Sequence, residues 1–184
     1  MTLPTSGLIT VNDRGARAAT TFGSVAAAGG NMVFIKKLTA SSSATLSFVD
    51  GASSVVLDST YKEYVFTFKD IHPATDNVHF TFQGNAAGGS GFDETITSTV
   101  FVAQHSEGGS GAEIGYSGGR DQAQGTGIQN ISDTIGSDND QSLSGYLRLF
   151  NPSSTTFVKH FMATTNIAHP SNFTMNNYSA GYFN

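Results

Sequence analysis

Few residues in this 184-residue chain have the types and spacing that enzymatic chemistry needs. A serine nucleophile typically lies in a Gly-x-Ser-x-Gly turn between a strand and a helix. Ser90 and Ser110 instead lie in GGSGF and GGSGA, whose glycines favour flexible loops. The segment from Gly125 to Gly127 lacks the further glycine and the lysine of a phosphate-binding loop. Neither pattern predicts a catalytic site.

Histidine and acidic residues do not form a complete metal-ligand pattern in the sequence. His105 and Glu107 could supply two ligands, but no third ligand is adjacent, and Asp138-Asn139-Asp140 lacks the glycine and terminal glutamate of a calcium loop. The absence of cysteine excludes disulfides and zinc–thiolate sites. We therefore expect no metal site and no cofactor. The histidines considered are His72, His79, His105, His160 and His169.

Paired carboxylates, which glycoside hydrolases use, remain the one other enzymatic pattern to consider. Two carboxyl groups must lie at a defined separation on either side of the scissile bond, and the sequence does not fix that separation. We expect no enzyme and assign no catalytic or cofactor-binding residue. The acidic residues considered are Asp93, Glu94, Glu107, Glu113, Asp121 and Asp133.

The composition narrows the class of protein and its partners. Charged residues make up 12% of the chain, about half the usual ~25%, while glycine is abundant and phenylalanine supplies 14 residues. A net charge of −5 argues against nucleic-acid binding, which needs a basic face. No apolar run approaches the ~18 residues of a membrane span, and the N-terminus lacks the pattern of a signal peptide. We expect neither a nucleic-acid partner nor membrane insertion.

Two runs of alternating residues give the clearest structural signal. Tyr64, Phe66 and Phe68 share one side of the first run, and Phe80 and Phe82 share one side of the second. The intervening IHPATDN favours a turn. The pattern predicts an antiparallel pair of strands whose aromatic side chains lie in the core.

The rest of the chain predicts further short strands and no long helix. We expect an all-β fold, an antiparallel β-sandwich or jelly roll, over residues 31–184. Residues 1–30 are poorly patterned and predict an N-terminal arm or docking segment. Residues 105–125 predict a long glycine-rich loop. Further strands are expected near residues 32–38, 44–49, 55–57, 94–104, 127–136, 143–152, 155–166 and 171–183.

Several segments resemble small virion proteins of marine tailed bacteriophages, especially cyanophages. The segments are the opening MTLPTSGLITVND, the block SSSATLSFVDG with LDSTYKEYVFTFKDIHPATDNVHFTFQ, and the later GYLRLFNPSS and NFTMNNYSAGYF. The resemblance implies an all-β, self-assembling structural protein and no catalytic residues. It also implies at least one further strand beyond the position of Asn184.

Two functions follow as expectations. The first is a structural component of a tailed-bacteriophage virion, assembled in the host cytoplasm as a homo-oligomer, most simply a homotrimer, and bound to other virion proteins. The alternative is a carbohydrate-binding module that recognises host surface glycans. Tyr116, Tyr146 and Tyr178 could then stack on sugar rings, although the lack of tryptophan weakens this alternative.

Overall fold

The structure is a computed structural model that describes residues 32–184. The chain divides into two units, Met1–Ile35 and Lys36–Asn184, and the second contains all the strands below. The arm predicted over residues 1–30 lies outside the described residues. The described part contains no helix; its strands are β1 (Glu63–Ile71), β2 (Val78–Phe82), β3 (Ile96–Ser106), β4 (Ala112–Tyr116), β5 (Ala123–Gly125), β6 (Gln129–Ile135), β7 (Leu143–Phe150), β8 (Lys159–His169) and β9 (Phe173–Phe183).

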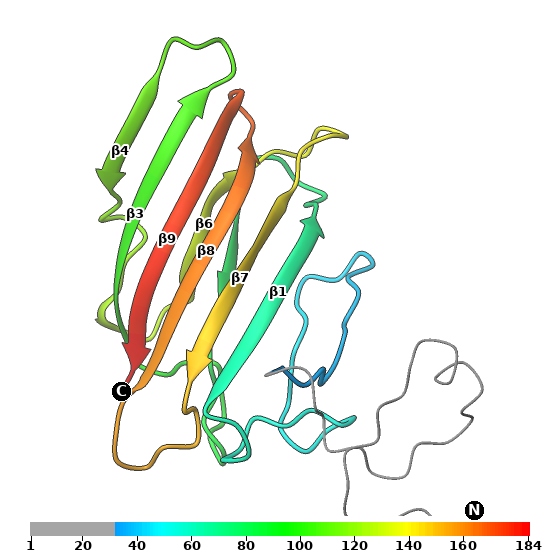
Figure 1. Ribbon diagram of the computed structural model, residues 1–184, viewed down its shortest axis with the longest axis vertical. Helices are drawn as coiled ribbons and strands as arrows, with labels where there is room; N and C mark the ends of the chain where they lie inside the picture. The colour runs from blue at the N-terminus through cyan, green and yellow to red at the C-terminus, as the bar shows by residue number, and fades with distance from the viewer. Residues whose placement is uncertain (1–31) are drawn as a thin grey trace, which may run out of the picture. The chain divides into compact units, whose positions relative to one another are not determined.

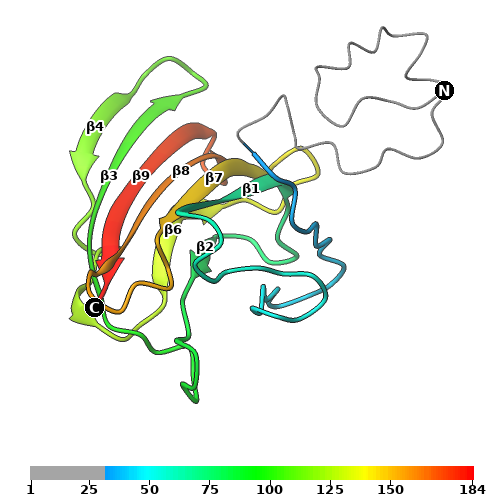
Figure 2. The ribbon, with the colours of Figure 1, turned by 60° about the horizontal axis from the view of Figure 1, so that its bottom comes forward.

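The strands form two antiparallel sheets in a sandwich-like arrangement. The seven-stranded sheet has the order β1-β7-β8-β9-β3-β4, and β5 also pairs with β3. The two-stranded sheet consists of β2 and β6 and lies against one face of the large sheet (Figures 1 and 2). The predicted all-β antiparallel sandwich is confirmed.

Strand β8 shows why this sequence builds a two-faced sheet. Phe161, Ala163 and Ile167 are buried, whereas Met162 and Asn166 between them are exposed. A period of two places successive side chains on opposite faces. The buried set points toward β6, which packs on β8 and β9. We call this covered side the inner face and the opposite side the outer face.

Aromatic rings fill the core between the two sheets. The ring of Phe82 lies 4.8 Å from that of Phe161 and 5.8 Å from that of Phe183, both nearly perpendicular to it. Tyr64 is 4% exposed, and Phe66 packs at the edge of the same core. Phe68, Phe80 and Phe82 also pack against buried clusters. The predicted placement of the aromatic runs in the core is confirmed.

The predicted pairing of the two aromatic runs with each other is wrong. β1 pairs with β7, and β2 pairs with β6, so the two runs belong to different sheets. They meet across the core instead, where the rings of Phe68 and Phe80 lie 4.9 Å apart. Each of the two strands has one aromatic face. Because β1 and β2 face each other across the core, both aromatic faces are buried.

The first expected strands are also absent. Residues 32–62 form no strand, and the chain turns at Gly51, Ser53 and Ser54, which all have positive φ angles. Phe48 nevertheless packs edge-on against Phe66, with ring centroids 5.3 Å apart. An apolar residue in a loop can thus reach the core without a strand around it.

Two further expectations need correction. The region of residues 105–125 is not a single loop, because it contains β4 and β5, both paired with β3. Phe157 does not share a buried face with Phe161, since β8 begins only at Lys159 and Phe157 is 71% exposed.

Polar residues occupy the middle of the sandwich, beside β6. Gln129 and Thr165 are fully buried, and the Thr165 hydroxyl donates a hydrogen bond of 2.5 Å to the carbonyl oxygen of Ile131. Asp133 accepts a 2.5 Å ion-pair contact from Arg120. These contacts provide partners for polar groups whose burial without partners would destabilise the fold.

We predict that Phe161→Ala lowers the free energy of unfolding by about 3–5 kcal/mol, because it removes a buried ring that two other rings contact. The neighbouring Met162→Ala is the matched control, since Met162 is 54% exposed on the other face. Urea denaturation followed by circular dichroism measures both. Equal effects of the two substitutions would contradict the assignment of faces.

Candidate binding face on the large sheet

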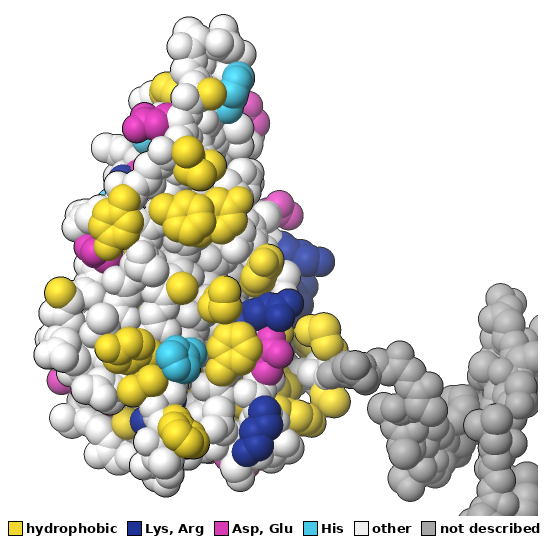
Figure 3. Space-filling view, turned by 60° about the vertical axis from the view of Figure 1, so that its left-hand side comes forward, with side chains coloured by type: hydrophobic (Ala, Val, Ile, Leu, Met, Phe, Trp, Pro, Cys, Tyr) yellow, Lys and Arg dark blue, Asp and Glu magenta, His cyan; other side chains and the backbone are white. Residues whose placement is uncertain are grey.

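The outer face of the large sheet is the candidate functional surface. The β2–β6 pair packs on the inner face, and within residues 36–184 no other strand packs on the outer one. Figure 3 shows hydrophobic side chains gathered in clusters on this side, among polar atoms that are mostly uncharged. Large exposed apolar groups on a folded domain are typical of interaction sites.

Strand register brings five residues into one line across the outer face. Tyr116 on β4 is opposite Phe101 on β3, and Phe101 is opposite Tyr178 on β9. Tyr178 is opposite Thr164 on β8, which in turn is opposite Tyr146 on β7. We call this line the aromatic row. Its four aromatic side chains come from four strands that are separated along the chain.

Local contacts hold three of these rings in place. Phe101 and Tyr178 stack, with centroids 4.6 Å apart and planes inclined by 12°. The guanidinium carbon of Arg148 lies 5.7 Å from the centre of the Tyr146 ring, which is a cation–π contact. Arg148 also forms a 3.1 Å ion pair with Glu63. Fixed rings lose less conformational entropy when a ligand binds.

The fourth ring, that of Tyr116, is oriented by a carboxylate. Its hydroxyl donates a hydrogen bond to Asp121, and this bond raises the pKa of Tyr116 because it stabilises the protonated phenol. Tyr116 is 64% exposed, so the ring is held from its hydroxyl end while its body faces solvent.

Between Tyr178 and Tyr146 the aromatic row is interrupted by Thr164 on β8. The ring of Tyr178 stacks on Phe101 of β3, on its other side. The row therefore consists of three aromatic residues on β4, β3 and β9 and a fourth, Tyr146, on β7 beyond Thr164.

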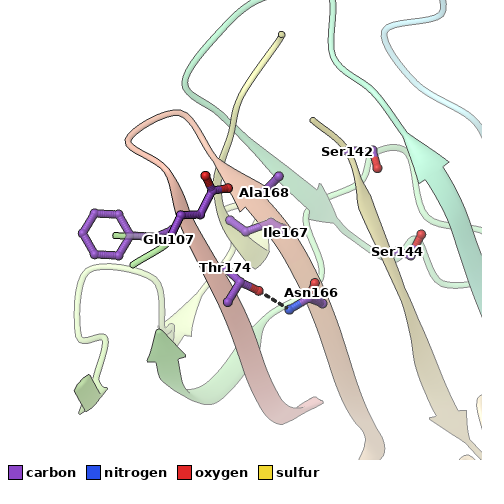
Figure 4. A pocket seen from close by; sticks show the side chains of 8 residues that line it. Glu107, Ser142, Ser144, Asn166, Ile167, Ala168 and Thr174 are labelled. Atoms are coloured by element: carbon purple, nitrogen blue, oxygen red, sulfur yellow. Dashed lines mark hydrogen bonds between the residues drawn. The ribbon is translucent and has the colours of Figure 1, made fainter. Parts of the chain in front are cut away.

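Two open hollows lie next to the aromatic row, with volumes of ≈ 220 Å³ and ≈ 240 Å³. Both are lined by Asn166 and Thr174, whose side chains are joined by a 3.1 Å hydrogen bond (Figure 4). Glu107 and Ser144 line the first hollow, and Asn176 lines the second. The outer face thus combines an aromatic row with amide, hydroxyl and carboxylate groups.

The histidines are spread over the molecule and form no metal centre. In the described residues, no group of three or more His, Cys, Asp or Glu side chains could hold a metal ion. His72 contacts the carbonyl oxygen of Gln141 at 2.7 Å, and His169 contacts the hydroxyl of Thr134 at 3.0 Å. His160 packs edge-on against Tyr182 on the outer face.

Several of the serine and carboxylate candidates make structural contacts. The amide of Ser110 donates to the hydroxyl of Ser106 in the β3–β4 turn, and Ser90 lies in the loop before β3. The carboxylate of Asp133 pairs with Arg120, and that of Asp121 accepts from Tyr116. The backbone carbonyl of Asp138 accepts a hydrogen bond from the amide of Gln141 in the turn before β7.

The three tyrosines considered for sugar stacking do lie on one surface. Tyr146 and Tyr178 lie in strands as expected, on β7 and β9, whereas Tyr116 lies on β4 within the region expected to be a loop; all three share the aromatic row. Phe101 and Thr164, which complete the row, were not predicted from the sequence. Phe101 alternates with the buried Val100, and this alternation was a usable signal for the outer face.

Comparisons of the chain with protein-family models, curated proteins and solved structures find no match. In the part of the chain that the structure describes, no helix is long and apolar enough to cross a membrane.

We predict that Asp121→Asn lowers the pKa of Tyr116 toward its ordinary value, because it removes the charged acceptor that favours the protonated phenol. Ultraviolet titration of the tyrosines measures this change. Tyr116→Phe serves as the control, since it deletes the corresponding step from the titration curve. An unchanged curve for Asp121→Asn would contradict the hydrogen bond.

Proposed function

We propose that the protein is a structural component of a tailed-bacteriophage virion, exposed on the tail, a fibre or the head. The sequence resemblance supports this function, and so does an all-β body that needs no disulfides and can fold in a bacterial cytoplasm. The structural observation that supports it best is a set of exposed apolar side chains on loops, away from the aromatic row.

These side chains lie at one end of the sheets. Phe92 precedes β3, Ile128 precedes β6, and Phe157 precedes β8; they are 58%, 60% and 71% exposed. The starts of β3 and β8 are both paired with Phe183 at the end of β9, so these loops share the end where the chain's last residue lies (Figure 1). We call Phe92, Ile128 and Phe157 the loop end.

The loop end is suited to contacts with other subunits. Only 12% of the residues are charged. Burying the exposed phenylalanines between subunits would remove apolar surface from water and stabilise an assembly. Closed cyclic symmetry is the usual arrangement of such homo-oligomers, and a trimer matches the symmetry expected of a fibre. Contacts between copies, and with other virion proteins, are thus assigned to the loop end.

We predict that the full chain forms a homo-oligomer and that replacing both Phe92 and Phe157 with Ser shifts it toward monomer, because both exposed rings are lost from the interface. Multi-angle light scattering measures the mass. Ile114→Ser is the control, since Ile114 is 71% exposed on β4, away from the loop end. A monomeric wild-type chain at high concentration would argue against this assembly.

The virion role itself is tested on particles. Mass spectrometry of gradient-purified particles of the encoding phage should detect the chain, and immunogold labelling should place it on the tail, a fibre or the head. Detection in infected cells, but not in purified particles, would exclude a structural role.

A second candidate function is recognition of host surface glycans. The specific observation in its favour is the aromatic row beside two polar hollows, since sugar rings have apolar C–H faces and a rim of hydroxyls. Aromatic side chains supply large contact areas to such ligands, and a few polar groups fix their orientation. A virion surface protein can carry both functions, because the loop end and the aromatic row are different surfaces.

A further inference from the structure

We infer that the free edge of β4 docks a second copy of this chain, and that the two β4 strands pair antiparallel about a two-fold axis at Ile114. β4 is the last strand of the large sheet and lies at its outer edge (Figure 1). Within residues 32–184, its one strand partner is β3. The pairing is separate from the loop end and joins two large sheets into one continuous sheet.

The ends of the β3–β4 pair show its hydrogen-bonding pattern. The amide of Ser106 donates to the carbonyl oxygen of Gly111, and the amide of Ser117 donates to that of Val100, both at 2.8 Å. These bonds extend the β3–β4 register by one pair at each end. In antiparallel strands, pairs that exchange hydrogen bonds alternate with pairs that do not. Every second residue, counted from Gly111, therefore directs its main-chain groups toward β3.

The remaining residues of β4 direct their main-chain groups away from β3. Their N–H and C=O groups line the free edge of the strand, and the residues are Ala112, Ile114 and Tyr116. None of these groups has a hydrogen-bond partner within residues 32–184. The side chains of Ile114 and Tyr116 beside them are 71% and 64% exposed. The edge thus offers main-chain hydrogen bonds next to apolar surface, which is what the addition of a strand requires.

The opposite edge of the large sheet is protected against such pairing. β1 carries the charged residues Glu63, Lys69 and Asp70, and its register with β7 shifts between Phe68 and Ile71. Charges and irregular register are devices by which edge strands avoid pairing with other chains. β4 has a single charged residue and no register shift with β3. Of the two edges, β4 is therefore the one suited to a partner strand.

The sequence of β4 is complementary to itself in an antiparallel pair. With Ile114 opposite Ile114 of the second copy, all the free N–H and C=O groups of the two edges meet. Ala112 then lies opposite Tyr116, which places a small side chain beside a large one. Glu113 lies opposite Gly115, so the two carboxylates do not face each other. Like charges directly opposite would weaken the pair, and this complementarity favours a second copy over an unrelated strand.

Pairing through β4 alone is weak between single copies. Five residues on each strand bury less surface than the about 1,200 Å² of a stable interface. The contact gains strength where copies are already held together, as the proposed contacts at the loop end would hold them. Because main-chain groups form the pairing, Ile114→Ser retains it and remains a control for the loop end.

The test uses disulfide trapping, because the chain contains no cysteine. Hydrogen-bonded antiparallel pairs have Cα atoms about 5.5 Å apart, within the range that a disulfide spans. Full-length Ile114→Cys is oxidised mildly and run on a denaturing gel without reductant, and circular dichroism shows that each variant is folded. Glu113→Cys is the matched control on the same strand, since its two copies would lie too far apart for a disulfide. Met162→Cys, 54% exposed elsewhere on the outer face, controls for random collisions.

We expect the disulfide-linked dimer to be the main product for Ile114→Cys, whereas both controls stay mainly monomeric on the gel. Mixing Ala112→Cys with Tyr116→Cys should give the mixed dimer in preference to either homodimer, because only the mixed pair lies opposite. A dimer yield for Ile114→Cys no higher than for Met162→Cys would overturn the inference, and so would a preference for homodimers in the mixture. The result does not depend on the virion role, which the particle experiment decides separately.

Discussion

The structure depends on the packing of β6 against the inner face of the large sheet. Five of the seven residues of β6 are buried, although the strand belongs to a sheet of only two strands. Ile131 and Ile135 join the apolar clusters of β7, β8 and β9. A two-stranded sheet is marginal by itself, so β2 and β6 persist because the large sheet covers them. The apolar clusters of the large sheet in turn lie where this pair packs on it.

This packing also explains the polar groups in the interior. The backbone of β6 pairs on one side with β2, and its other side meets side chains instead of a further strand. The Asn177 side-chain oxygen accepts from the amide of Asp133 at 2.8 Å, and Thr165 donates to the carbonyl of Ile131. Side chains of β8 and β9 thus take the place of a missing strand neighbour, which is why polar residues sit among the inner-face positions.

The sequence predicts which face of a strand is buried more securely than it predicts which strands pair. Alternation identified the aromatic residues of β1 and β2 as core residues, since that depends only on the local period of two. The pairing of β1 with β7 and of β2 with β6 depends on contacts between residues that are 47 or more positions apart, which no local pattern encodes. The turn-like IHPATDN is compatible with a hairpin and equally with a crossing between sheets. The candidate binding face also depends on pairing between distant strands. Its aromatic residues become neighbours only through strand register; they are Tyr116, Phe101, Tyr178 and Tyr146.

The outer face is best understood through the residues that separate its aromatic side chains. If the face served only to hide apolar surface, a large residue at Thr164 would join Tyr178 to Tyr146 and close the row. Threonine instead interrupts the row next to the stack of Phe101 on Tyr178. The nearby Asn166 and Asn176 keep polar atoms beside the row. Because strand register sets the position of each residue in the row, aromatic and polar side chains stay together on this face, which is what the proposed recognition of glycans requires.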